Sequence, residues 1–207
     1  HGLVVIEDAT ESLGGVYRAG GGARRCGALG HIACLSFNGN KIITCGGGGM
    51  ILTDRQDWAD RARYLTTQAK DDPVEFVHEH VGYNYRLTNL QSALGCAQFE
   101  RLGEHVAAKR RIASAYRQAL CGVPGLEVMG EAPWAESAFW MSAVRVTPER
   151  YGMDSRALLR RLATEGIETR PLWQPLHLSP AHRDAQRRTC PAAEDWYRRT
   201  LCLPCSV

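Results

Sequence analysis

The sequence predicts an α/β protein with a larger first domain and a smaller α/β domain after it. Short apolar, β-branched runs that end in polar residues alternate with segments whose apolar residues recur at helical spacing. At residues 122–125 the run GVPG interrupts this pattern. We therefore expect domains at residues 1–121 and 122–207.

Three strands are expected in the first half of the chain. Each is a short apolar run bounded by turn-forming residues, and a glycine- and arginine-rich segment at 14–30 is expected to be a loop. The expected strands are residues 3–6, 31–37 and 50–53.

Helical spacing of apolar residues predicts the remaining elements of the first domain. These helices are residues 55–68, with Asp54 as the N-cap, 88–101 and 104–120. In the second domain we expect a strand at 138–146, a helix at 154–165 capped by Asp154, and a helix at 191–200 entered through Pro191.

Composition is that of a globular protein. The 207 residues are 44% hydrophobic and 23% charged, and no apolar run is long enough to span a membrane. The N-terminus also lacks the features of a signal peptide, so we expect a cytoplasmic protein. Because the chain begins without methionine inside a strand-like run, we expect that part of the protein lies upstream.

Charge and cysteine content argue against two classes of function. The formal charge of +3 divides into −2 for residues 1–100 and +5 for residues 101–207, which is too diffuse for a nucleic-acid binder. Among eight cysteines only Cys202 and Cys205 are closely spaced, so we expect neither a disulfide scaffold nor a structural zinc site.

Polar side chains follow the first two expected strands. Asp8 and Glu11 come just after one, Ser36 lies at the carboxyl end of the other, and Lys41 follows it. If the strands are neighbours, Asp8 and Lys41 project into one crevice at the sheet edge where ligands bind in α/β proteins. The pair could be a structural ion pair. However, a lysine on a turn of Asn and Gly, followed by four glycines, is also suited to Schiff-base chemistry.

Several segments in order resemble the DegT/StrS sugar aminotransferases: VIEDATESLGG, SFNGNKIITCGGGGM, ARYLTTQAKDD, GYNYRLTNLQSALGCAQ, TRPLWQPLH and LCLPCSV. Among the branches of this family the sequence is most similar to the LegC-type enzymes. The resemblance implies part of a large domain of the fold type I transferases that depend on pyridoxal 5'-phosphate (PLP), with a mixed, mostly parallel sheet. It also implies that the chain corresponds to about the C-terminal half of such an enzyme.

The resemblance assigns roles to individual residues. Lys41 matches the lysine that forms the Schiff base with PLP and moves the proton, and Asp8 matches the aspartate at the pyridinium nitrogen. Glu11 lies where relatives contact the cofactor ring, and Ser36 matches a serine that binds the phosphate. Asn84 matches an asparagine that reaches the phosphate of the partner subunit, which implies a homodimer with shared active sites.

Two further residues are expected near the substrate. Arg86 could hold a carboxylate of the amino donor, although a surface or interface ion pair is an equal alternative. His177 lies in a segment near the substrate in relatives, where structural hydrogen bonding is the competing interpretation. The implied reaction moves an amino group, from L-glutamate, to a nucleotide-linked 4-keto-6-deoxy sugar. The alternative is a truncated, non-catalytic remnant that serves as a folded or dimerising module.

Overall fold

The computed structural model describes residues 1–207 and divides into two compact units. Unit 1 comprises His1–Ala108 and Glu131–Trp140, and unit 2 comprises Lys109–Gly130 and Met141–Val207. The chain thus returns to unit 1 at residues 131–140. The expected domain limits after residue 121 stay a prediction, because compact units and domains need not share a boundary.

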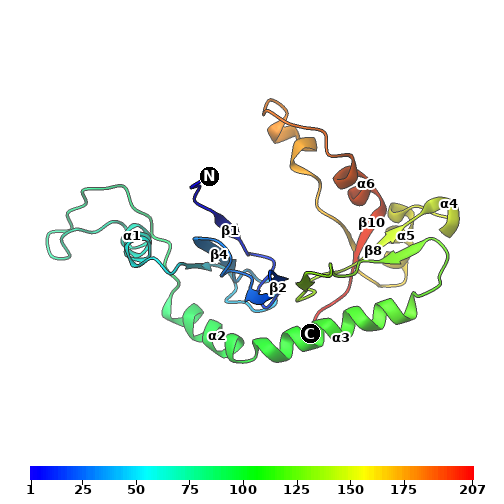
Figure 1. The fold of residues 1–207 in the computed structure, drawn as a ribbon, viewed down its shortest axis with the longest axis horizontal. Coiled ribbons are helices and arrows are strands. Elements are labelled where there is room, and N and C mark those ends of the chain that lie inside the picture. The colour runs from blue at the N-terminus through cyan, green and yellow to red at the C-terminus, as the bar shows by residue number, and fades with distance from the viewer. The chain divides into compact units, whose positions relative to one another are not determined.

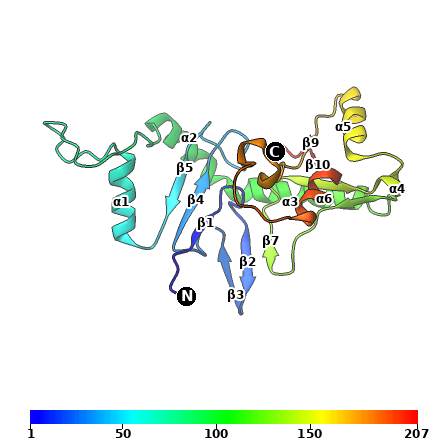
Figure 2. The same ribbon diagram turned by 90° about the horizontal axis from the view of Figure 1, so that it is seen from above.

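The central sheet of unit 1 brings the first two expected strands together. Strand β1 (Ile6–Asp8) pairs in parallel with β4 (Ile32–Ser36), and β4 pairs antiparallel with β5 (Gly49–Leu52). Figure 1 labels β1 and β4, and Figure 2 shows all three strands. The carboxyl ends of β1 and β4 therefore lie at the same edge of the sheet. The first strand begins later than the apolar run predicts, since pairing starts only at Ile6.

The expected loop at residues 14–30 is wrong in part, because it contains a hairpin. Strand β2 (Val16–Ala19) pairs antiparallel with β3 (Gly22–Arg25), and its other edge receives β7 (Ala135–Glu136). Gly20 and Gly21 have φ of +60° and +80°. Positive φ at both central residues suits a two-residue hairpin turn, and the Gly20–Gly21 pair is its signal in the sequence.

Three helices of unit 1 lie where helical spacing predicts them, and their bounds are α1 (Gln56–Thr66), α2 (Asn89–Glu100) and α3 (Leu102–Ala119), the last continuing into unit 2. Asp54 is not the N-cap of α1: the cap position is Arg55, without a side-chain cap hydrogen bond. Helix α2 begins with a capping box, in which Thr88 and Gln91 exchange hydrogen bonds.

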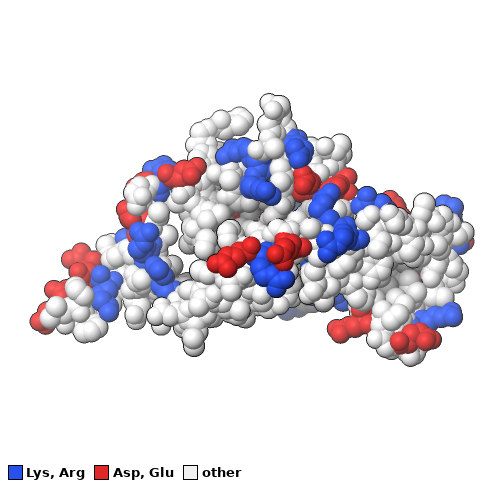
Figure 3. Space-filling view, turned by 90° about the horizontal axis from the view of Figure 1, so that it is seen from below, with Lys and Arg blue, Asp and Glu red and all other residues white.

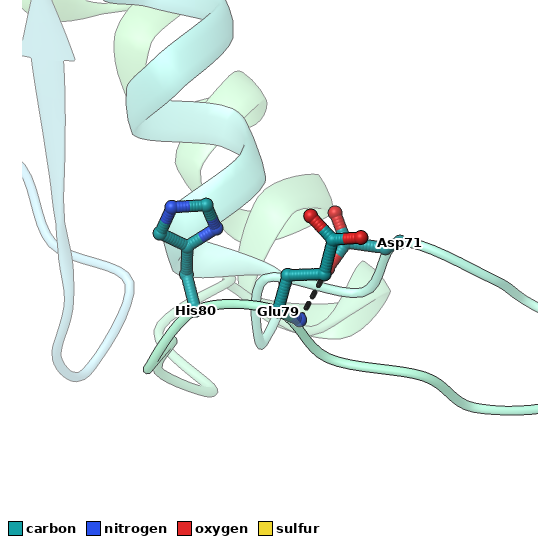
Figure 4. A group of neighbouring side chains, drawn as sticks. All are labelled: Asp71, Glu79 and His80. Carbon is teal, nitrogen blue, oxygen red and sulfur yellow. Dashed lines mark hydrogen bonds between the residues drawn. The ribbon is translucent and has the colours of Figure 1, made fainter.

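The segment between α1 and α2 is held to α1 by side chains. The hydroxyl of Tyr64 donates to Asp71 at 2.9 Å and lies 3.1 Å from His80 Nδ1. Asp71 also accepts the backbone N–H of Glu79 at 2.7 Å, the bond drawn in Figure 4. These hydrogen bonds close the loop on itself and account for its polar cluster.

Unit 2 is built on a four-stranded antiparallel sheet with the order β6 (Leu126–Val128), β8 (Ser142–Val146), β10 (Thr200–Leu203), β9 (Arg170–Pro171). Its core consists of Val144, Val146, Leu158, Leu201 and Leu203. The helices are α4 (Pro148–Tyr151), α5 (Ser155–Thr164) and α6 (Pro191–Arg199), with two 3-10 turns, η1 (Leu176–Leu178) and η2 (Pro180–His182).

The expected strand at 138–146 is too long. Only Ser142–Val146 is a strand, because residues 138–140 belong to unit 1. Asp154 caps α5 as predicted, accepting the backbone N–H of Ala157 at 2.7 Å.

Surface charge is mixed. On the face drawn in Figure 3, Lys and Arg side chains lie among Asp and Glu side chains. No concentrated basic patch stands out on this face. All eight cysteines are free thiols, and the chain has no helix long and apolar enough to cross a membrane.

Candidate active site

The turn after β4 carries Lys41 and is fixed by the backbone. The backbone N–H of Lys41 donates to Asn38 O at 3.0 Å. The backbone N–H of Phe37 donates to Gly48 O at 2.9 Å, and Phe37 O accepts the N–H of Cys45 at 3.0 Å. A Cβ at Gly49 would meet the carbonyl oxygen of Leu35. Glycine is therefore needed there for β5 to approach β4 this closely.

The amine of Lys41 lies beside a carboxylate and an aromatic ring. Nζ is 3.3 Å from Glu11 Oε1 and 4.1 Å from the ring centroid of Trp140. The Lys41 side chain is 12% exposed. With Ser36 and Thr10 these residues line a small pocket at the carboxyl end of the sheet.

Asp8 ends β1 and is held as an anion by its neighbours. The hydroxyl and backbone N–H of Thr10 donate to Asp8 Oδ1 at 2.7 and 3.1 Å. These bonds, and the charge of Lys41, hold the pKa of Asp8 below its ordinary value. The carboxylate that pairs directly with Lys41 is that of Glu11. The sequence had instead suggested Asp8 as the partner of Lys41.

Ser36 lies where the sequence predicts, at the end of β4. Its Oγ accepts the backbone N–H of Asn38 at 3.3 Å. A hydroxyl that accepts one bond still has a hydrogen to donate. Ser36 can thus present a donor to an anionic group in the pocket.

The other predicted site residues lie elsewhere. Asn84 and Arg86 are exposed and line a separate, larger pocket of about 990 Å³ against β5 and α1. His177 belongs to η1 in unit 2, and its Nε2 is 3.1 Å from Glu194 Oε1. The described residues therefore bring Lys41, Glu11 and Ser36 together with Asp8 nearby, but they do not bring Asn84 or Arg86 into that pocket.

Three residues that shape the site were missed by sequence reasoning. Thr10 stabilises the charge of Asp8. The carboxylate of Glu7 accepts the backbone N–H groups of Gly27, Leu29 and Gly30 at 2.6 to 3.1 Å and so fastens the segment before β4. Trp140 is buried, and its contact with Lys41 spans 99 positions of sequence and has no local signal.

A nearly buried lysine on a strand-end turn, with carboxylates and a hydroxyl around it, is the arrangement expected of the PLP-dependent transferases of fold type I. The chain belongs to the DegT/DnrJ/EryC1/StrS aminotransferase family, which matches it over residues 1–207. The family and the fold class predicted from the sequence are thus confirmed.

Two curated relatives show how far the similarity extends. The chain is 38% identical over 208 residues to EpsN of Bacillus subtilis (strain 168), named as a pyridoxal phosphate-dependent aminotransferase, covering 99% of this chain and 52% of EpsN. It is 39% identical over 188 residues to the GDP-perosamine synthase of Caulobacter vibrioides (strain ATCC 19089 / CIP 103742 / CB 15), covering 88% of this chain and 48% of that protein. The chain spans about half the length of the curated relatives it matches.

Solved structures give the same result. The aminotransferase TlmJ from Streptoalloteichus hindustanus matches with a TM-score of 0.87 and 30% identity over 98% of this chain and 53% of TlmJ. DesV from S. venezuelae, solved in complex with a ketimine intermediate, matches with a TM-score of 0.85 and 31% identity over 99% of this chain and 53% of DesV.

The residues present fit the cofactor of this family, PLP, which the sequence predicted. Lys41 supplies a primary amine at a pocket, and Asp8 supplies a carboxylate that its neighbours keep ionised. Ser36 supplies a hydroxyl donor. PLP requires, among other groups, an amine, an anion beside its ring nitrogen and a hydrogen-bond donor to its phosphate.

Proposed function

We propose that this chain is part of a PLP-dependent aminotransferase that moves an amino group from L-glutamate to a nucleotide-linked 4-keto-6-deoxy sugar. The observation that carries the proposal is the meeting of Lys41, Glu11 and Ser36 in one pocket at the carboxyl ends of β1 and β4, with Asp8 at the end of β1. Similarity to a GDP-perosamine synthase supports a nucleotide sugar as the acceptor. The LegC-type branch and a cytoplasmic location belong to the same proposal.

The residues of the pocket have distinct tasks in this reaction. When bound, PLP supplies an electron sink for negative charge at the carbon that gains or loses the amino group. Lys41 would hold the cofactor through its amine and move a proton to and from that carbon. Asp8 would hold a proton at the ring nitrogen, which requires the carboxylate to stay ionised, as its lowered pKa favours. The Ser36 hydroxyl would donate to the phosphate.

Residues outside the pocket are proposed to act from a second subunit or on the substrate. Asn84, which is exposed, would contribute to the phosphate site of a partner subunit in a homodimer. Arg86 would bind the carboxylate of the amino donor, because a guanidinium matches a carboxylate in a two-bond contact. His177 would contact the substrate, and its bond to Glu194 would orient the ring.

The test is an absorbance spectrum of the chain with added PLP. We expect an absorbance band that is missing in Lys41→Ala and that bleaches when L-glutamate is added. Lys70→Ala is the matched control, because Lys70 lies beside Phe76 outside the pocket and should leave the band unchanged. A folded chain that shows the same spectrum with and without Lys41 would contradict the proposal and favour a non-catalytic module.

A further inference from the structure

Trp140 contacts the turn that carries Lys41 in two independent ways. Its ring centroid lies 4.1 Å from Lys41 Nζ, within the range in which a cation and an aromatic face attract each other. Its indole N–H donates to the backbone oxygen of Asn40 at 2.6 Å. Trp140 is 6% exposed, and the Lys41 side chain is 12% exposed. Both contacts are therefore largely shielded from water.

From these contacts we propose that Trp140 is a positioning residue for the amine of Lys41, an inference that rests on the proposed role of Lys41 in the aminotransferase. The ring face holds the charged end of the side chain at the pocket. The indole N–H holds the peptide unit immediately before Lys41. Together they fix both ends of the lysine, its backbone and its amine.

The segment that delivers Trp140 is itself fastened to unit 1. Strand β7 pairs with β2, and the Arg18 guanidinium forms an ion pair of 2.5 Å with Glu136. The backbone N–H of Arg18 donates to the backbone oxygen of Trp134 at 2.7 Å. The position of Trp140 is thus set by contacts that do not involve Lys41. A support that is anchored independently can hold a flexible side chain in place.

Backbone strain next to Trp140 points the same way. Phe139 is 7% exposed and has φ of +47°, a conformation that a bulky residue rarely adopts. The Ser137 hydroxyl oxygen accepts the Phe139 N–H at 3.0 Å and helps to hold this conformation. Such strain persists where the surrounding structure requires a particular placement. The residue that directly follows the strained Phe139 is Trp140, so the required placement is that of the Trp140 ring.

The experiment is competitive acylation of the full 207-residue chain without PLP, with the lysines read by peptide mass spectrometry. The chain contains only Lys41, Lys70 and Lys109, so each serves a separate purpose. Lys41 reports the proposed contact, Lys70 is the reference, and Lys109, which is 6% exposed, reports whether the fold is intact.

Two variants remove the contacts to different extents. Trp140→Phe keeps a weaker ring face and loses the indole N–H, and Trp140→Leu loses both. We expect the Lys41:Lys70 labelling ratio to rise about two- to fivefold, more in the Leu variant, as expected for the loss of a shielded cation–π contact. Trp134→Phe is the matched control, because Trp134 is 55% exposed on the same segment and should leave the ratio unchanged.

A Trp140 that only fills space would lower stability without changing the Lys41:Lys70 ratio, and an unchanged ratio in Trp140→Phe would overturn the proposal. If Trp140→Leu raises Lys109 labelling, it has lost the fold and Trp140→Phe alone decides. The absorbance test with PLP separates the two hypotheses. A Lys41-dependent absorbance band with an unchanged labelling ratio would support the aminotransferase and contradict the role of Trp140. A raised labelling ratio without an absorbance band would support the contact between Trp140 and Lys41 and contradict the aminotransferase.

Discussion

Glu7 shows how one side chain can organise a site from outside it. It lies in β1, one residue before Asp8, and its carboxylate accepts three backbone N–H groups from the segment between β3 and β4. Burial acts to raise the pKa of Glu7, but these three bonds together lower it below its ordinary value. The charged form of Glu7 therefore stabilises the folded chain.

Replacement of Glu7 by Gln tests this anchor. We expect Glu7→Gln to lower the free energy of unfolding at neutral pH by about 1–3 kcal/mol, because an amide cannot accept all three bonds as well as a carboxylate. A depressed pKa means that this stabilisation is present above the unfolded value and is lost as pH falls through the folded value. The gap between wild type and variant should thus close below about pH 4.5.

The measurement is chemical denaturation across this pH range. Glu75→Gln is the control, since Glu75 is an exposed glutamate of the loop after α1. A gap between wild type and Glu7→Gln that persists at low pH would show that charge is not the cause.

At the scale of the elements, two aspartates that look alike in the sequence differ in whether they cap a helix. Asp54 and Asp154 each precede a predicted helix, but only Asp154 accepts a backbone N–H of its helix. A side chain caps a helix only when its backbone takes the extended conformation at the N-cap position, and in α1 that position is Arg55. The position of the cap depends on where the chain leaves β5, which the local sequence does not specify.

The two aspartates form a matched pair for mutation. We expect Asp154→Ala to lower the free energy of unfolding by about 1 kcal/mol, because the first turn of α5 loses its cap next to the core residue Leu158. Asp54→Ala should change it by less than about 0.5 kcal/mol. Thermal or urea denaturation of both variants provides the measurement, and equal effects would contradict this assignment of the caps.

At the scale of the whole molecule, the proposed homodimer requires Asn84 to lie apart from the Lys41 pocket of its own chain. Lys41 and Asp8 come from one chain, whereas Asn84 lines a different pocket and is exposed. In a symmetric dimer with shared sites, two chains that are defective in different residues can restore one intact site between them.

Mixing of defective chains measures this sharing. Lys41→Ala and Asn84→Ala, refolded together in equal amounts, should recover about a quarter of the wild-type sites, as judged by the PLP band that bleaches with glutamate. The control mixes Lys41→Ala with Asp8→Asn, which should recover none, because both residues are supplied by the same chain. Equal recovery in the two mixtures would argue against a shared site.

The sequence by itself determined the elements whose signals are local. A short apolar run bounded by turn-forming residues predicted β4, and the N-cap Asp154 helped to predict α5. The turn of Asn and Gly before four glycines indicated Lys41. The order of several separated motifs also identified the family and the cofactor. The strand, helix and turn signals depend on neighbouring residues, and each motif is recognised within its own segment, so none of them requires knowledge of the fold.

Only the tertiary structure decided which side chains meet. It paired Lys41 with Glu11, placed the ring of Trp140 over the lysine amine, and joined β7 to β2 more than 100 positions away. Each of these contacts depends on how distant segments pack, and packing has no periodic signal in the sequence. The sequence therefore indicated the candidate reactive residues, whereas the residues that hold them in position were identified only from the fold.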